Sequence, residues 1–93
     1  MRLKDKVAII TGGASGIGRE TCRLFAREGA KIMIADLIIE EANKVANELK
    51  AQGHQAIAKK VDVTSLDEAN RLAKFTLDKF GQIDILANIA GGS

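Results

Sequence analysis

Short apolar runs alternate with longer amphipathic segments along this sequence, and this alternation constrains the fold more than any other feature. The apolar runs lie at residues 7–10, 31–35, 56–63 and 83–89. Runs of this length are typical of strands that a parallel sheet buries on both faces. The segments between them place apolar residues three or four positions apart, as amphipathic helices do. The order predicts an α/β fold in which right-handed crossovers join parallel strands.

Composition limits the chain to one small domain, residues 1–93, and narrows its partners. The 14 Lys and Arg alternate with 12 Asp and Glu, which argues against nucleic acid and against a membrane surface. The runs at 7–10 and 32–35 are too short to span a bilayer. The single cysteine, Cys22, excludes an internal disulfide and favours a reducing, cytoplasmic compartment. One histidine and one cysteine make a metal site implausible.

Glycines and capping residues indicate where three helices begin and end. Gly29, Gly53 and Gly81 each follow an amphipathic segment, where a left-handed residue commonly ends a helix. Thr64 or Ser65 is expected to cap the third helix. The second helix should bury a face made of Ile38, Ala42, Val45, Ala46 and Leu49. The third should bury Leu66, Ala69, Leu72, Ala73, Thr76 and Phe80.

The turn before the first helix is rich in glycine and reads Thr-Gly-Gly-Ala-Ser-Gly-Ile-Gly from Thr11 to Gly18. A helix N-terminus offers unpaired N–H groups and a partial positive charge, which together suit a pyrophosphate. We expect Gly12 to allow the sharp exit from the strand and Gly16 to keep side chains away from the phosphates. Gly18 should let the helix pack against the sheet, and the small Ser15 should leave the loop open. A plain strand-to-helix turn is the alternative, but the flanking strand and helix favour a dinucleotide site.

Asp36 ends the second apolar run, eighteen residues after Gly18. A carboxylate at this offset accepts hydrogen bonds from the adenosine ribose hydroxyls and repels a 2′-phosphate, so it favours NAD(H) over NADP(H). A polar residue that merely ends a strand is the competing interpretation. No Lys-Ser or Lys-Thr pair follows the last glycine, which excludes the phosphate loop of nucleoside triphosphatases.

Together these motifs resemble the N-terminal part of the short-chain dehydrogenase/reductase family, and the resemblance covers the whole chain. Besides the glycine turn and Asp36, it rests on Asp62-Val63 after the third run and on the segment from Asn88 to Gly91 after the fourth. The family implies a Rossmann-type domain, NAD(H) as cofactor and oxidoreduction by hydride transfer.

The resemblance also implies roles for individual residues. Asp62 and Val63 would contact the adenine ring, and Asn88, Ala90 and Gly91 would lie along the cofactor's ribose and the centre of the sheet. The complete set of residues predicted to contact the dinucleotide is Gly12, Ser15, Gly16, Ile17, Gly18, Asp36, Leu37, Asp62, Val63, Asn88, Ala90 and Gly91.

The chain departs from the family pattern in two ways. Ile89 stands where the family usually has a second Asn. The family's catalytic Ser and its Tyr-x-x-x-Lys pair would lie beyond Ser93, so no catalytic residue is assigned. We therefore expect a chain that binds NAD(H) and is catalytically inert by itself. The alternatives are a fragment or partner chain of an active NAD-dependent alcohol, ketone or 3-oxoacyl oxidoreductase, and a non-catalytic interaction module. An S-adenosylmethionine or flavin site on the same fold fits the motifs less well.

The predicted architecture is half of a doubly wound sheet, with four parallel strands in the order 3-2-1-4 and three helices. The first two helices should cover one face and the third the other, with the site at the carboxyl ends of strands 1 and 4. On the third helix's face, apolar side chains of strands 1 and 4 are expected to lack a cover. Ile9, Ile85 and Leu86 are the candidates, and the sequence alone does not fix which of them points to this face. The fourth strand is also left as an open edge. Both features predict a homo-oligomer through this face or edge.

Overall fold

The computed structural model describes residues 2–89. Its elements, in chain order, are β1 (Val7–Thr11), α1 (Gly16–Arg27), β2 (Lys31–Asp36), α2 (Ile39–Ala51), β3 (Ala56–Lys60), α3 (Leu66–Phe80) and β4 (Ile85–Asn88). The predicted alternation of strands and helices is therefore confirmed. The fourth strand is shorter than the apolar run that predicted it. None of the three helices is long and apolar enough to cross a membrane within residues 2–89.

The four strands form one parallel sheet in the order β3-β2-β1-β4, as predicted. β1 pairs with β2 on one side and with β4 on the other. The chain adds β2 and β3 on one side of β1 and then crosses over to add β4 on the other side, so the strand order reverses beside β1. At the carboxyl edge Thr11 is in register with both Ala35 and Asn88. In α/β sheets of this kind, ligands bind at this edge, beside the strands where the order reverses.

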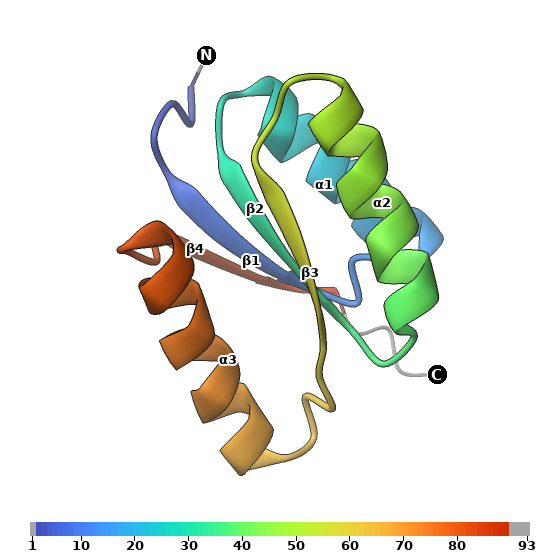
Figure 1. Cartoon of the computed structure of the whole chain (residues 1–93), viewed down its shortest axis with the longest axis vertical. Coiled ribbons are helices and arrows are strands. Elements are labelled where there is room, and N and C mark those ends of the chain that lie inside the picture. Colours follow the sequence, from blue (N-terminus) through green and yellow to red (C-terminus); the bar gives the residue numbers. More distant parts are fainter. Residues whose placement is uncertain (1, 90–93) are drawn as a thin grey trace.

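The helices cover the two faces of the sheet unequally, with α1 and α2 on one face and α3 alone on the other (Figure 1). Alternate residues of β1 and β2 point to opposite faces, as strands require. Toward α1 and α2 the sheet buries a cluster that includes Ile10, Ile32, Ile34, Cys22, Val45 and Leu49. Toward α3 it buries a smaller cluster of Ile9, Met33, Ala35, Val61 and Leu72. The prediction for the placement of the helices is confirmed.

Two expectations about the helix faces were wrong, and both concern residues at the start of a helix. Ile38 is 55% exposed because it precedes α2 with an extended backbone, and Ile39 packs against the core instead. Leu66 is 77% exposed because it begins α3 more than a turn before Leu72, the first buried residue of that helix. Ser65, one of the two predicted caps, accepts a hydrogen bond from the backbone N–H of Glu68.

Candidate functional site

The glycine turn joins β1 to α1 at the carboxyl edge of the sheet and is closed by its own hydrogen bonds. Gly12 has a φ of 70°, a left-handed conformation that supplies the predicted sharp exit from the strand. Its carbonyl accepts from the Ser15 hydroxyl at 2.8 Å and from the Ser15 N–H at 3.2 Å. The Ser15 Oγ in turn accepts from the Gly18 N–H at 3.1 Å. Ser15 therefore caps α1 and holds the turn together, a role that its small size alone did not indicate.

A side chain added at Gly18 or at Gly16 would meet very different surroundings. A Cβ on Gly18 would lie 2.0 Å from the carbonyl oxygen of Gly12, so this glycine permits the start of α1 to pack closely against the turn's own backbone. A Cβ on Gly16 would meet nothing within 4 Å, which leaves open space at the start of α1. The open space is where the sequence predicted a pyrophosphate.

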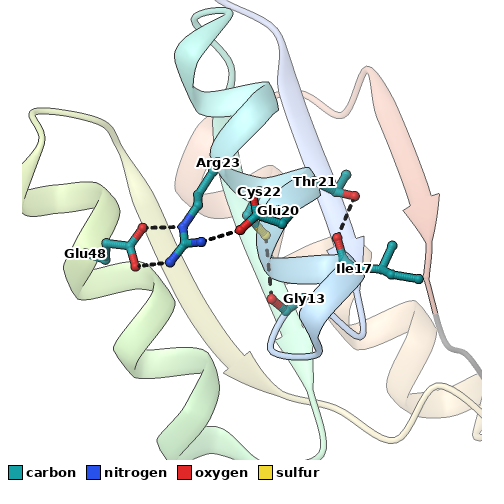
Figure 2. A network of polar contacts seen from close by, with 7 residues as sticks. All are labelled: Gly13, Ile17, Glu20, Thr21, Cys22, Arg23 and Glu48. Carbon is teal, nitrogen blue, oxygen red and sulfur yellow. Dashed lines mark hydrogen bonds and ion pairs between the residues drawn. The ribbon is translucent and has the colours of Figure 1, made fainter.

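Gly13, for which no contact was predicted, packs tightly against side chains of β2 and α1. A Cβ there would lie 2.7 Å from Ile34 Cγ2 and 3.2 Å from Cys22 Sγ. The Cys22 thiol, fully buried in α1, lies 3.9 Å from the Gly13 carbonyl oxygen, which accepts its weak hydrogen bond (Figure 2). Burial raises the pKa of this thiol to about 12, so it stays protonated and acts as a packing residue beneath the turn.

An ionic cluster fastens α1 to α2 beside the turn (Figure 2). Arg23 donates from Nε and Nη2 to the two carboxylate oxygens of Glu48, at 2.6 and 2.8 Å, and also pairs with Glu20. This forked geometry is the one that arginine and a carboxylate favour. The hydrogen bonds from Arg23 lower the pKa of Glu48, and those to Glu48 raise that of Arg23. The helix whose N-terminus forms part of the candidate site is thereby held against its neighbour.

Asp36 lies at the end of β2, beside the glycine turn, as the sequence predicted. One carboxylate oxygen accepts from the Ala14 N–H at 3.1 Å, and the other accepts from the Ile38 N–H at 3.0 Å. The next residue, Leu37, is 60% exposed at the same edge. The contact with Ala14 was not predicted, because the two residues are far apart in the sequence and only the fold brings them together.

The third strand brings Asp62 and Val63 to the same edge, because the Val61 N–H donates to the carbonyl oxygen of Asp36 at 3.0 Å. The Asp62 carboxylate accepts from the hydroxyl and the N–H of Thr64, at 2.6 and 3.0 Å, and these bonds lower its pKa. Val63 is half-buried beside it. Both predicted adenine contacts, Asp62 and Val63, therefore lie one strand away from the predicted ribose contact, Asp36.

The fourth strand completes this edge on the other side of β1. The Thr11 hydroxyl donates to Asn88 Oδ1 at 2.7 Å and ties the carboxyl ends of the two strands together. The predicted contacts Ala90 and Gly91 lie outside the described residues. Among residues 2–89, no group of three or more His, Cys, Asp or Glu side chains is placed to hold a metal ion.

A mainly apolar cleft of about 260 Å³ lies on the α3 face, with Thr11 and Asn88 in its lining. Leu86 lines it and is 66% exposed, as expected of a residue without a cover. The same expectation was wrong for Ile9, which is only 4% exposed because it packs into the cluster under α3. The sequence left the direction of Ile85 open, and the structure places it on the face covered by α1 and α2.

Comparison with known proteins agrees with this geometry. A sequence model described as short chain dehydrogenase matches residues 6–93. The chain is 45% identical over 92 residues to a 7alpha-hydroxysteroid dehydrogenase of Escherichia coli, and 47% identical over 91 residues to zerumbone synthase of Zingiber zerumbet. These matches cover 99% and 98% of this chain, but only 36% and 34% of the two relatives. The chain therefore spans about a third of the length of these relatives.

Solved structures show the same relationship. A crystal structure of hydroxysteroid dehydrogenase from Escherichia coli superposes with a TM-score of 0.94 at 45% identity, over 98% of this chain and 39% of that one. A 7α-hydroxysteroid dehydrogenase complexed with NADH and 7-oxo glycochenodeoxycholic acid superposes with a TM-score of 0.89 at 44% identity, over 91% of this chain and 33% of that one. The order of strands, the glycine turn and the sequence match agree: this chain belongs to the short-chain dehydrogenase family and corresponds to the N-terminal, Rossmann-type part of its members.

Proposed function

We propose that this chain binds NAD(H) as the nucleotide-binding part of a short-chain oxidoreductase. The observation that carries the proposal is the open space at Gly16, where α1 begins, with Asp36 one strand away at the same edge of the sheet. Gly16 and Ile17 begin the helix, and the first N–H groups of a helix have no partner within it. A pyrophosphate placed there would accept from these groups and lie in the positive field of the helix N-terminus.

The remaining contacts follow from the order of the strand ends. Asp36 would accept from the adenosine ribose hydroxyls and select NAD(H) over NADP(H), and the exposed Leu37 would flank the adenosine. Asp62 and Val63 would hold the adenine ring. Asn88, with Ala90 and Gly91, would extend the site toward the second ribose. NAD accepts a hydride in family chemistry, but the family's catalytic Ser, Tyr and Lys have no counterpart in these residues, so the chain alone should be inert.

The experiment is a titration of the chain with NADH, followed by NADH fluorescence. Gly16→Val should abolish binding without loss of helix content, because its side chain fills the space kept for the phosphates and meets no protein atom near its Cβ. Asn47→Val is the matched control, because it places the same branched side chain on an exposed position of α2. Normal binding by Gly16→Val, or no binding by the parent chain, would refute the site.

Turnover separates this proposal from its alternatives. A binding module gives no oxidation of simple alcohols and no reduction of ketones, whereas an active enzyme does so with NAD(H). If flavin or S-adenosylmethionine binds where NADH does not, the site belongs to another class of ligand. Cytoplasmic placement, which the single cysteine favours, stays a prediction.

We also propose that the chain self-associates through the α3 face or the outer edge of β4, beside which the described residues place no further strand. Leu86 is exposed beside an apolar cleft, and β4 pairs with β1 alone among the described strands. An unpaired edge next to uncovered apolar surface favours pairing with a second copy. Sedimentation at micromolar concentration should show a dimer or larger species, and Leu86→Lys should shift it toward monomer. A stable monomer of 9.9 kDa would refute the proposal.

A further inference from the structure

The carboxylate of Asp36 joins two segments that a dinucleotide would have to meet together. One oxygen accepts from Ala14 in the glycine turn at 3.1 Å, and the other accepts from Ile38 in the turn before α2 at 3.0 Å. We propose that Asp36 is a positioning residue that holds the glycine turn in its binding shape before any cofactor arrives. This role rests on the proposed NAD(H) site. It goes beyond the contact between Asp36 and the ribose hydroxyls, because it makes the affinity for the pyrophosphate depend on Asp36 as well.

The end of β2 holds the turn at two points. The Gly12 N–H donates to the carbonyl oxygen of Ala35 at 2.8 Å, and the Ala14 N–H donates to the next residue, Asp36. Between these points Gly13 packs against Ile34 and Cys22, which prevent the turn from moving toward the core. Asp36 is therefore the group that fixes the turn at Ala14. Without its carboxylate the Ala14 N–H would have no partner among the groups that the structure describes.

The direction of this hydrogen bond decides which donors remain for a phosphate. The Ala14 N–H donates to Asp36, whereas the N–H groups of Gly16 and Ile17 begin α1, have no partner within the helix, and are available to a ligand. A turn released from Asp36 could rotate its N–H groups away from this arrangement. Binding would then have to restore the order, and the cost of ordering lowers the affinity.

Electrostatic repulsion alone predicts that loss of the Asp36 charge would raise the affinity for a pyrophosphate, whereas a positioning role predicts that it would lower it. The two explanations can therefore be told apart. A carboxylate near a pyrophosphate repels it, so removing the charge of Asp36 should strengthen the binding of any ligand that does not use its ribose contacts. The 2′,3′-dideoxyadenosine analogue of NADH is such a ligand, because it lacks both hydroxyls of the adenosine ribose. Weaker binding of this analogue to an Asp36 variant can come only through the two segments that Asp36 holds, the glycine turn and the turn before α2.

The test measures the dissociation constant of the dideoxy analogue for the parent chain, Asp36→Ala and Asp36→Asn. We expect Asp36→Ala to raise it about tenfold, as the loss of a charge-assisted hydrogen bond implies. Asp36→Asn keeps one acceptor oxygen for two N–H donors, so it should fall between the two. Asp84→Asn is the matched control: its carboxylate accepts from the Val7 N–H at 2.8 Å, at the amino end of β1. An unchanged or tighter dissociation constant for Asp36→Ala overturns the inference.

Hydrogen exchange of the Ala14 amide in the ligand-free chain separates this inference from the proposed function. Asp36→Ala should speed this exchange about tenfold, and Asp84→Asn should leave it within about twofold of the parent. Equal exchange in the parent and in Asp36→Ala refutes the positioning role even where NADH binds normally. Failure of the parent to bind NADH refutes the proposed site instead, whatever the exchange of Ala14 shows.

Discussion

Replacing Gly18 with alanine tests how closely the glycine turn packs against the helix that it starts. The new Cβ would lie 2.0 Å from the Gly12 carbonyl oxygen and 2.8 Å from Gly13 Cα. Even close carbon–oxygen contacts measure about 3.3 Å or more, so the turn would have to move by roughly 1 Å. The neighbours are backbone atoms, which cannot rotate away as the end of a flexible side chain can. The same movement would break the cap that Ser15 makes to the Gly18 N–H.

The expected loss of stability follows from these contacts. Overpacking a rigid site costs about 1–3 kcal/mol, and loss of an N-cap costs about 1 kcal/mol more. Alanine returns about 0.5–1 kcal/mol because it favours the helix more than glycine does. We therefore expect Gly18→Ala to lower the free energy of unfolding by about 1–3.5 kcal/mol, a large part of the roughly 5–14 kcal/mol expected for a chain of this size.

Urea unfolding followed by far-ultraviolet circular dichroism measures this change, since the chain has no tryptophan or tyrosine to serve as a fluorescent probe. Gly16→Ala is the matched control, because its Cβ meets nothing within 4 Å. It should unfold at the parent's midpoint or slightly above it. Equal midpoints for the two variants would refute the packing of Gly18 against Gly12.

Three further predictions concern charge and reactivity. Burial raises the pKa of the Cys22 thiol to about 12, so this thiol should resist alkylation at mildly alkaline pH in the folded chain and react at once in concentrated urea. Rapid labelling of the folded chain would contradict its burial. The pKa of Glu48 is lower in the folded than in the unfolded chain. Its stabilisation is therefore present above the unfolded value and lost as the pH falls through the folded one, so Glu48→Gln should flatten the acid side of a plot of Tm against pH. NADH should bind at least about tenfold more tightly than NADPH, a difference of about 1.4 kcal/mol, and equal affinities would remove Asp36 from its role in selectivity.

The order of the elements follows from the sequence because its signals are local. Periods of apolar residues distinguish strands from helices, and glycines such as Gly29, Gly53 and Gly81 stand where the helices end. The handedness of parallel crossovers then leaves few ways to arrange four strands and three helices. The glycine turn and Asp36 were found in the same way, because their spacing is set by the length of one strand and one helix.

The tertiary structure alone decided which side chains meet across these elements. Gly13 rests on Ile34 and Cys22, and Asp36 accepts from Ala14, 22 residues away, because the register of β1 against β2 brings the turn over the end of the second strand. Likewise, Ile9 is covered because it packs into the same cluster as Met33 and Leu72, whereas Leu86 lines the cleft on the α3 face and is exposed. No local period carries such information. Contacts between distant residues depend on strand register and helix placement, which the packing of the whole chain determines.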